Sequence, residues 1–317
     1  MSRFMLNDNS LWGYLREIYD MRGALSILGA RGSNTLWVDP VNGDNGRSGR
    51  SMTNALATIT KALTLVKTGD FILCLPGQYD ESPTISRTDS EDDALSRLTI
   101  IGLGGRGAAF IEPSTEDADG LTVHADDVTL INLGVAAEDE TAGNYALTVT
   151  GTRFRAYGCK FEGGEQQVRI GPGTVAQEAA GTHGRGADSL FDDCELCWGT
   201  YGFVVVCTDY GAVTQIVVKG SRFHNIVTAC VFEVVGSGGA AAVLFRNFQI
   251  HNCVFDDNEG GAAPTFYVDL NGDNGNDGIV AGNYFPTAID SGTNLVSTAM
   301  HWIGNYHTGG IGAAQPS

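Results

Sequence analysis

The chain has 317 residues, enough to bury a large core in one elongated domain or in two compact ones. Its 43 glycines, few prolines and long stretches of Val, Ile, Thr, Phe, Asn and Asp are typical of strands joined by tight turns. The formal net charge of −18 repels nucleic acid and anionic membranes, so neither is expected as a partner.

The first 34 residues differ from the rest and predict a helical segment. Leu11, Tyr14, Leu15 and Ile18 recur at helical spacing, with Asn9 or Ser10 as candidate N-cap. Two roles remain open: a cap over the end of the following domain, or an anchor that docks the body on a larger structure through these four side chains. The segment lacks the basic flank and apolar core of a secretory signal.

Residues 35–105 give a strand, a turn cluster, a helix and a second strand. TLWV precedes the turn-forming sequence NGDNG, and FILCL is a buried strand that ends in a Pro-Gly turn. Between them the sequence predicts a helix over 53–67, whose apolar face is formed by Leu56, Ile59, Ala62, Leu63 and Val66.

A degenerate repeat follows. LTIIG, ending at Gly102, aligns with VTLIN, ending at Asn132, so that Thr99 lies over Thr129. A small residue then precedes an apolar residue by two places, in the pairs Cys159 and Phe161, Cys194 and Leu196, Ser221 and Phe223, Cys253 and Phe255, Asn283 and Phe285, and, imperfectly, Asn305 and His307. The steps from Gly102 along the small positions are 30, 27, 35, 27, 32, 30 and 22 residues. Such a period predicts a solenoid with a stack of apolar side chains inside it and a ladder of small residues at one corner.

An antiparallel sandwich or barrel also has short strands, but hairpins predict paired strands with two-residue turns. Here the same motif returns in one orientation. The opening, strand, N-G-x-N-G turn, LATITKAL helix and TGDFILCLPGQYDE, resembles that of pectin-lyase-like proteins. The resemblance implies an all-β, right-handed parallel β-helix over 35–308, whose entry helix covers the first coil, with a short N-terminal helical segment over 1–34 and a tail over 309–317.

Many proteins of this family cleave polysaccharides. Hydrolases need two carboxyl groups about 5–10 Å apart, a spacing that neighbouring coils can supply. The candidate catalytic residues are Asp192, Asp193, Glu195, Asp256 and Asp257, with Glu162, Glu165, His224 and His251 near the same register. Acidic residues also line any soluble solenoid, so this set alone does not predict an enzyme. The lyase variant lacks a basic residue grouped with acidic calcium ligands.

Metal binding is not predicted. The seven cysteines lie mostly in apolar runs and are expected to be reduced and buried. Cys194 and Cys197 form a CxxC motif, but a zinc site needs a second ligand pair at suitable spacing. Asp269, Asn271 and Asp273 begin a loop similar to a calcium loop, yet the expected turn glycine and bidentate Glu are missing, so we interpret it as a structural turn with weak calcium character.

A helical N-terminal segment before a β-helix, no secretion signal and reduced cysteines together resemble bacteriophage virion proteins. The resemblance implies a homotrimer made in the host cytoplasm. It would be a tailspike or tail-fibre type projection attached to other virion proteins by its N-terminal segment, with host surface glycan as ligand and no cofactor. The alternatives are a capsid decoration protein of the same fold, a polysaccharide depolymerase, and a bacterial carbohydrate-binding or scaffold protein.

Overall fold

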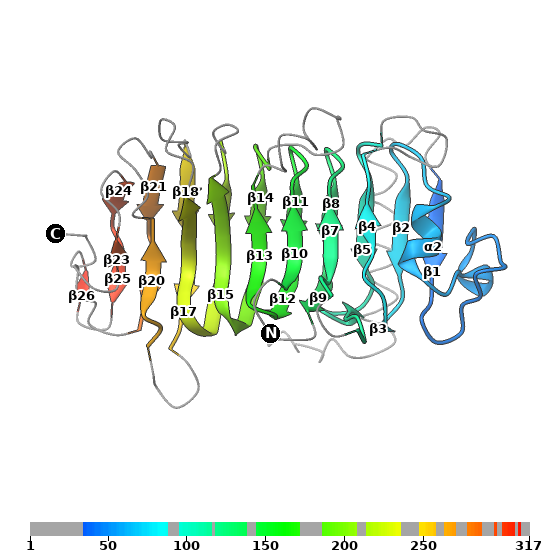
Figure 1. Ribbon diagram of the computed structural model, residues 1–317, viewed down its shortest axis with the longest axis horizontal. Helices are drawn as coiled ribbons and strands as arrows, with labels where there is room; N and C mark the ends of the chain where they lie inside the picture. The colour runs from blue at the N-terminus through cyan, green and yellow to red at the C-terminus, as the bar shows by residue number, and fades with distance from the viewer. Residues whose placement is uncertain are drawn as a thin grey trace, which may run out of the picture.

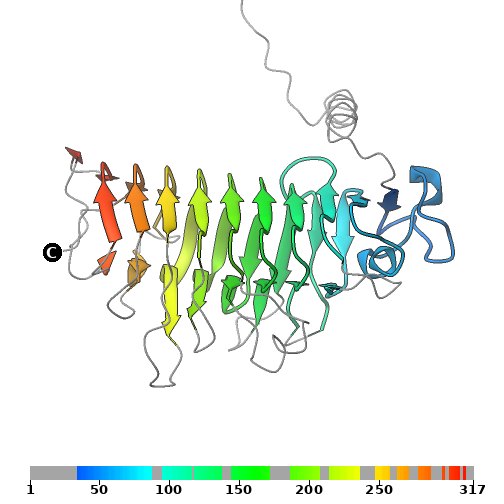
Figure 2. The ribbon, with the colours of Figure 1, turned by 90° about the horizontal axis from the view of Figure 1, so that it is seen from above.

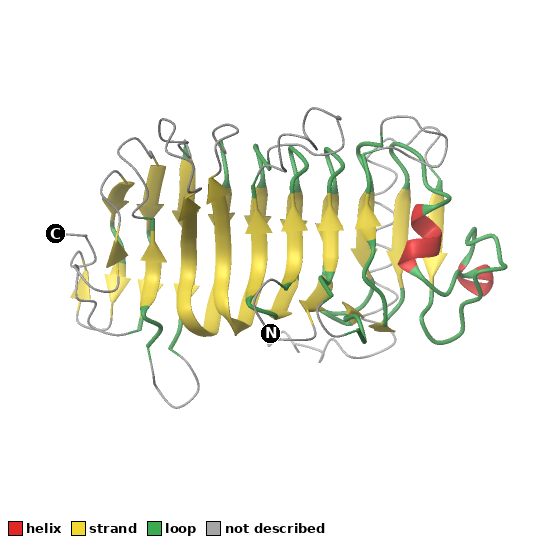
Figure 3. Ribbon diagram, viewed as in Figure 1, coloured by secondary structure: helices red, strands yellow, loops and turns green. Residues whose placement is uncertain are grey.

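The structure, a computed structural model, describes residues 34–87, 95–115, 118–137, 144–171, 186–207, 214–235, 247–257, 263–270, 278–286, 295–296, 300–307 and 310–311. This part of the chain is a right-handed parallel β-helix. The chain advances along the long axis of the solenoid from β1 to β26 (Figure 1), and strands make up nearly all of its regular structure (Figure 3).

One side of the solenoid is a sheet of ten parallel strands, the ten-strand sheet. Each strand pairs in register with its equivalent one coil later; Thr99 lies beside Thr129 and Ile101 beside Ile131, as the repeat predicts. In order, the strands are β1 (Thr35–Val38), β2 (Phe71–Cys74), β5 (Thr99–Gly102), β8 (Thr129–Ile131), β11 (Arg155–Tyr157), β14 (Leu190–Asp192), β16 (Val217–Lys219), β18 (Phe248–His251), β21 (Gly278–Ala281) and β24 (Met300–Ile303).

The remaining sixteen strands form a second sheet with two ladders. The first ladder contains β3 (Gly77–Tyr79), β6 (Ala109–Ile111), β9 (Leu133–Ala137), β12 (Lys160–Gly163), β15 (Glu195–Cys207), β17 (Arg222–Val235), β19 (Val254–Phe255), β22 (Tyr284–Phe285), β25 (Tyr306–His307) and β26 (Gly310–Ile311). The second contains β4 (Thr84–Ile85), β7 (Leu121–Val123), β10 (Tyr145–Val149), β13 (Gln166–Ile170), β20 (Phe266–Asp269) and β23 (Leu295–Val296). The long strands β15 and β17 belong to both ladders, because β12 pairs with the start of β15 and β13 with its second half. Figure 2 shows the coils stacked side by side.

Strand pairing excludes the antiparallel alternative for the described residues. Every pair is parallel except β25 with β26, which turns back at the C-terminal end. β26 lies within the predicted tail, so regular structure extends beyond residue 308.

The corner between the ten-strand sheet and the first ladder is a two-residue turn with a left-handed first residue. Asn132, Gly158, Asp193, Gly220, Asn252, Gly282 and Gly304 all have φ between 54° and 65° there. Gly, Asn and Asp tolerate this conformation best, which explains their recurrence. The predicted repeat is wrong by one residue at Asn132. The prediction aligned Asn132 with Cys159, but Asn132 is the left-handed residue equivalent to Gly158, and Leu133 takes the position equivalent to Cys159.

The apolar side chains that follow these left-handed residues by three positions stack inside the solenoid, as predicted. Phe161, Leu196, Phe223 and Phe255 lie in register and are fully buried. The Phe255 ring is nearly parallel to those of Phe223 and Phe285, with centroid distances of 4.8 Å to each. The small positions form the predicted corner ladder.

In that ladder, side chains on one coil satisfy backbone groups on the coil before. Ser221 Oγ accepts from Cys194 N at 3.1 Å, and Asn283 Oδ1 accepts from Cys253 N at 2.9 Å. Asn283 Nδ2 donates to the carbonyl oxygen of Ile250, and Asn305 Nδ2 to that of Val280. Buried polar groups are therefore paired within the turn.

The predicted helix over 53–67 is shorter than the sequence suggests. The structure has a 3-10 turn, η1 (Met52–Asn54), and an α-helix, α2 (Ile59–Leu63). Leu56 cannot join a helix because it bridges Val38 in an extended conformation. Thr58 caps α2 by accepting from Lys61 N, and the Glu81 carboxylate accepts from Ile59 N and Thr60 N. The buried side of α2 covers the first coil, as the resemblance implies.

A second apolar cluster lies on the outward side of the ten-strand sheet near its first strands. It contains Phe71, Leu73, Leu75, Ile101 and Leu103. The predicted anchoring residues Leu11, Tyr14, Leu15 and Ile18 lie outside the described residues. None of the helices in the described ranges has the length and apolar character needed to cross a lipid bilayer.

Candidate functional site

The corner that leads into the ten-strand sheet is built from unusual residues. Six successive coils place a non-glycine residue in the left-handed conformation there, at φ between 55° and 59°: Arg97, Asp127, Arg153, Asp188, Gln215 and Asn247. A left-handed L-residue is strained by roughly 1–2 kcal/mol, and Arg or Gln gains nothing there from local hydrogen bonding of the kind available to Asn. These residues therefore form a polar edge with a strained backbone, one residue per coil.

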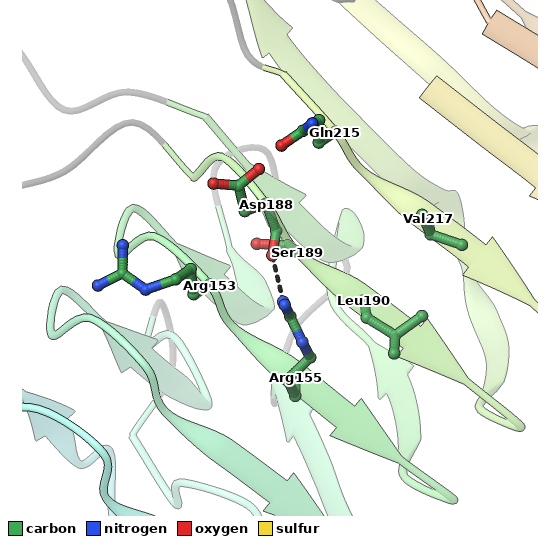
Figure 4. A pocket seen from close by; sticks show the side chains of 7 residues that line it. All are labelled: Arg153, Arg155, Asp188, Ser189, Leu190, Gln215 and Val217. Atoms are coloured by element: carbon green, nitrogen blue, oxygen red, sulfur yellow. Dashed lines mark hydrogen bonds between the residues drawn. The ribbon is translucent and has the colours of Figure 1, made fainter. Parts of the chain in front are cut away.

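Three of these corner residues line a groove. With Arg155, Ser189, Leu190 and Val217 they border a shallow groove of about 370 Å³ that is widely open to solvent. Figure 4 shows Arg153, Asp188 and Gln215 on the rim, and Leu190 and Val217 along the strands below them. Arg155, Leu190 and Val217 are in register on β11, β14 and β16. An apolar floor with a polar rim is the usual composition of a ligand site, so we call this the corner groove.

The two arginines in the corner groove are held differently. Arg153 forms a bidentate ion pair with Asp127, through Nε at 2.6 Å and Nη2 at 2.8 Å. This pairing lowers the pKa of the Asp127 carboxyl and raises the pKa of Arg153. Arg155 Nη1 donates to the carbonyl oxygen of Phe154 and also to that of Asp188, the second bond being the one drawn in Figure 4. Both guanidinium groups are thus fixed, in a chain whose overall charge is strongly negative.

The predicted catalytic carboxylates do not share one site. Asp192 is the last residue of β14 and pairs with Lys219 at 2.9 Å on the ten-strand sheet. Asp193 forms the left-handed corner, and Glu195 begins β15 on the other sheet. His251, predicted near the same register, lies beside Lys219 on the ten-strand sheet.

Asp193 and Glu195 do meet, through a cation. Arg106 Nη2 lies 2.7 Å from Asp193 Oδ2, and Arg106 Nη1 lies 3.9 Å from Glu195 Oε2. On its other side, Glu195 Oε1 accepts from His224 Nε2 at 2.9 Å. These groups join a charged outward row on the first ladder, in which Lys160, Glu195 and Arg222 lie in register.

A second outward row runs alongside. Glu162 is in register with Cys197, and Cys197 with His224. Cys197 Sγ lies 3.7 Å from Glu162 Oε2, and Lys160 forms an ion pair with the same carboxylate. Burial raises the pKa of the Cys197 thiol to about 12, an effect that Glu162 and Glu195 reinforce and Lys160 opposes. We call Lys160, Glu162, Glu195, Cys197, Arg222 and His224 the charged ladder.

The last two predicted carboxylates are also engaged. Asp256 pairs with Arg222 through Nε and Nη2, both at 2.6 Å. Asp257 accepts from the Tyr267 hydroxyl at 2.5 Å. Within the described residues, each predicted carboxylate thus has a cationic or hydroxyl partner, and none of these contacts sets two carboxyl groups across an open cleft as a glycosidase requires.

The structure describes only part of the predicted weak metal candidates. Asp269 ends β20, whereas Asn271 and Asp273 lie outside the described residues. In the CxxC motif, Cys194 belongs to the internal core cluster, while Cys197 does not and its thiol contacts a carboxylate on the outward side. The motif therefore does not present two thiols to one metal ion.

One polar group on the second ladder was not foreseen from sequence. Burial raises the pKa of the Asp119 carboxyl, although Tyr145 N donates to it at 3.0 Å and Arg169 lies nearby. The Arg169 guanidinium sits 5.4 Å from the centre of the Tyr145 ring. Gln167, two residues before Arg169 in the chain, is fully buried, and neither of its amide atoms has a hydrogen-bond partner among the described residues. Asp119, Tyr145 and Arg169 are far apart in the sequence and form no local motif. Their contacts follow only from the register in which the coils stack.

No family model and no curated protein matches the sequence. Solved structures do match. The Escherichia coli protein ybhc has a TM-score of 0.57 at 12% identity, covering 88% of this chain and 86% of its own. Pectin methylesterase from Aspergillus niger reaches 0.54 at 15% identity, covering 90% and 89%. Pectate lyase Pel9A reaches 0.52 at 14% identity, covering 87% and 78%.

At these identities the likeness concerns the fold. The chain thus shares the parallel β-helix fold of these structures, which is the fold that the opening segment and the repeat predict.

Proposed function

We propose that this protein is a bacteriophage virion protein whose β-helix projects from the particle and contacts a glycan of the host surface through the corner groove. The corner groove carries the proposal. Its rim of Arg153, Asp188 and Gln215 offers planar donors and acceptors suited to sugar hydroxyls, and its floor of Leu190 and Val217 suits the apolar face of a sugar ring. The Arg153 side chain is held by its ion pair with Asp127 and needs little further ordering on binding.

The virion part of the proposal rests on domain order: a distinct N-terminal segment followed by a rigid solenoid. Exposed apolar side chains near the C-terminal end add support for the homotrimer. Val254, Tyr284 and Tyr306 lie in register on the outward side of the first ladder and are 38%, 39% and 45% exposed. Contact between subunits would remove this column from water.

Glycan binding is tested by measuring the affinity of the full chain for a panel of acidic and neutral bacterial surface oligosaccharides. The variant Gln215→Gly removes a rim side chain at φ +59°, where glycine relieves strain. The matched control is Asn247→Gly, one coil further along the same corner, at φ +55° and outside the groove.

We expect the first variant to weaken binding about tenfold, the equivalent of one or two lost hydrogen bonds, and the control to bind like the unmodified chain. Equal affinities for all three proteins, or no binding to any glycan, would remove the corner groove from the proposal.

A depolymerase remains the alternative enzyme function, because two of the matching structures carry the names of enzymes that act on pectin or pectate. It predicts release of reducing ends from a host polysaccharide, lost in Asp193→Asn or Asp257→Asn. The capsid decoration alternative predicts a copy number close to that of the major shell protein.

A further inference from the structure

Three side chains of different metal-binding chemistry converge on the charged ladder. The ligand atoms of Glu195, Cys197 and His224 all lie within 4.8 Å of one another. Glu195 and Cys197 are two residues apart on β15, so they point to the same side of the strand. His224 is the register neighbour of Cys197 on β17. The two strands are the longest of the described part, so the backbone that carries these groups is firmly paired.

Cys197 differs from the other cysteines in its surroundings. Cys74, Cys159, Cys194, Cys230 and Cys253 all belong to the internal apolar core cluster. Cys197 is equally buried but belongs to neither apolar cluster of the described residues, and its thiol faces the Glu162 carboxylate. A buried thiol that only fills space should lie among apolar groups, so its position here calls for another explanation.

The geometry suits a tetrahedral ion. Thiolate, imidazole and carboxylate bind Zn²⁺ at about 2.0–2.3 Å, which places neighbouring ligand atoms roughly 3.5 Å apart. Glu195 Oε1 and His224 Nε2 are already 2.9 Å apart. Cys197 Sγ lies within 4.8 Å of both atoms, so the three ligands need to close by little more than about 1 Å to reach the spacing of a metal site. Because the thiol and the carboxylate bind as anions, they neutralise the two charges of the ion.

The charged groups around the three ligands keep partners when a metal ion binds. Glu162 lies in register with Cys197, and its Oε2 is 3.7 Å from the sulfur. Arg106 keeps Asp193 as a partner at 2.7 Å when Glu195 turns to the metal, so no cation is stranded there. The nearby Lys160 keeps its ion pair with Glu162.

We propose that Glu195, Cys197 and His224 form a binding site for a divalent transition metal ion of the zinc class, with water as the fourth ligand. The site tethers adjacent coils of the solenoid, since its ligands come from β15 and β17. It is separate from the corner groove and does not depend on the proposed function.

The test is titration of the full chain, freed of metal with a chelator, with Co²⁺ and then Zn²⁺. We expect one Co²⁺ per chain, a thiolate-to-cobalt charge-transfer band in the near ultraviolet, and displacement by Zn²⁺. Trp198, adjacent to Cys197 and 45% exposed, serves as a second probe, because bound Co²⁺ quenches its fluorescence.

Two variants and two controls locate the site. Cys197→Ser and His224→Gln should each weaken Co²⁺ binding by about 100-fold or more, since even the loss of an outer partner weakens metal sites 10–100-fold. The control Cys194→Ser removes the other thiol of the CxxC motif and is tolerated, because Ser221 occupies the equivalent rung one coil later. The second control is His251→Gln on the ten-strand sheet.

The charge-transfer band should vanish in Cys197→Ser and persist in both controls. Absence of metal binding by the unmodified chain would overturn the proposal. So would unchanged binding by Cys197→Ser, or an equal loss in Cys194→Ser. Circular dichroism shows whether each variant keeps its strands; if Cys197→Ser unfolds, His224→Gln and the spectrum of the unmodified chain decide the matter.

Discussion

Removal of the Phe255 side chain should strongly destabilise the solenoid. Phe255 is fully buried, and its ring lies 4.8 Å from Phe223 at 8° and 4.8 Å from Phe285 at 11°. It also meets the edge of Tyr267 at 6.3 Å. Phe255→Ala should therefore lower the free energy of unfolding by about 3–5 kcal/mol, toward the upper end because the coils above and below cannot collapse into the gap.

The assay is urea unfolding followed by circular dichroism and by tryptophan fluorescence, with coincident transitions required. Val227→Ala is the control, since Val227 on β17 is 62% exposed and lies outside the apolar column of Val254, Tyr284 and Tyr306. It should change the free energy of unfolding by no more than about 0.5 kcal/mol. A loss under about 1 kcal/mol for Phe255→Ala, or equal losses for both variants, would refute the stacked core.

Three further predictions concern the corners. Asn283→Ala removes the side-chain partner of two buried backbone groups on the preceding coil, the Cys253 N–H and the Ile250 carbonyl, and should lower the free energy of unfolding by about 2–4 kcal/mol in the same assay, whereas a loss below about 1 kcal/mol would mean that the ladder is incidental. In Gly151→Ala the new Cβ would lie 1.9 Å from a backbone oxygen of the preceding coil, so this variant should unfold at a clearly lower temperature; Gly105→Ala, with open space around its Cβ, should not, and similar midpoints for both would contradict the packing.

Because its ion pair with Arg153 lowers the pKa of Asp127 in the folded state, the pair adds stability above the unfolded pKa of about 3.9, and this stability disappears as pH falls through the folded value. Asp127→Asn should thus be less stable than the unmodified chain at neutral pH, by no more than about 1 kcal/mol for so exposed a pair, and equally stable in strong acid; a constant difference would contradict the assignment.

The internal side of the solenoid could be predicted because the repeat itself encodes it. The pairing of Thr99 with Thr129 follows from the alignment of LTIIG with VTLIN. The stack from Phe161 to Phe285 follows from the small residue that stands two positions before each apolar one. The repeat was misaligned at Asn132 because an Asn holds the left-handed turn position in that coil, whereas Gly158 holds the same position in the next coil. The helix over 53–67 was too long because apolar spacing cannot distinguish Leu56 in an extended bridge from Leu56 in a helix.

The outward side could not be predicted in the same way. Asp192 and Glu195 are three residues apart in sequence, yet the left-handed turn at Asp193 sends them to different sheets. Cys197 and His224 meet only because two strands pair in one register, and the varying step length of the repeat hides which residues become neighbours. Outward contacts depend on this register, whereas core positions depend only on alternation along each strand.

The proposal of a virion projection is tested most directly by the copy number of this chain in purified phage particles from its source. Quantitative mass spectrometry against the major shell protein gives that number. The account predicts that the chain is present in a small multiple of three copies per particle. Its absence from the particles would contradict the account, and a number equal to that of the shell protein would replace the projection with a capsid decoration.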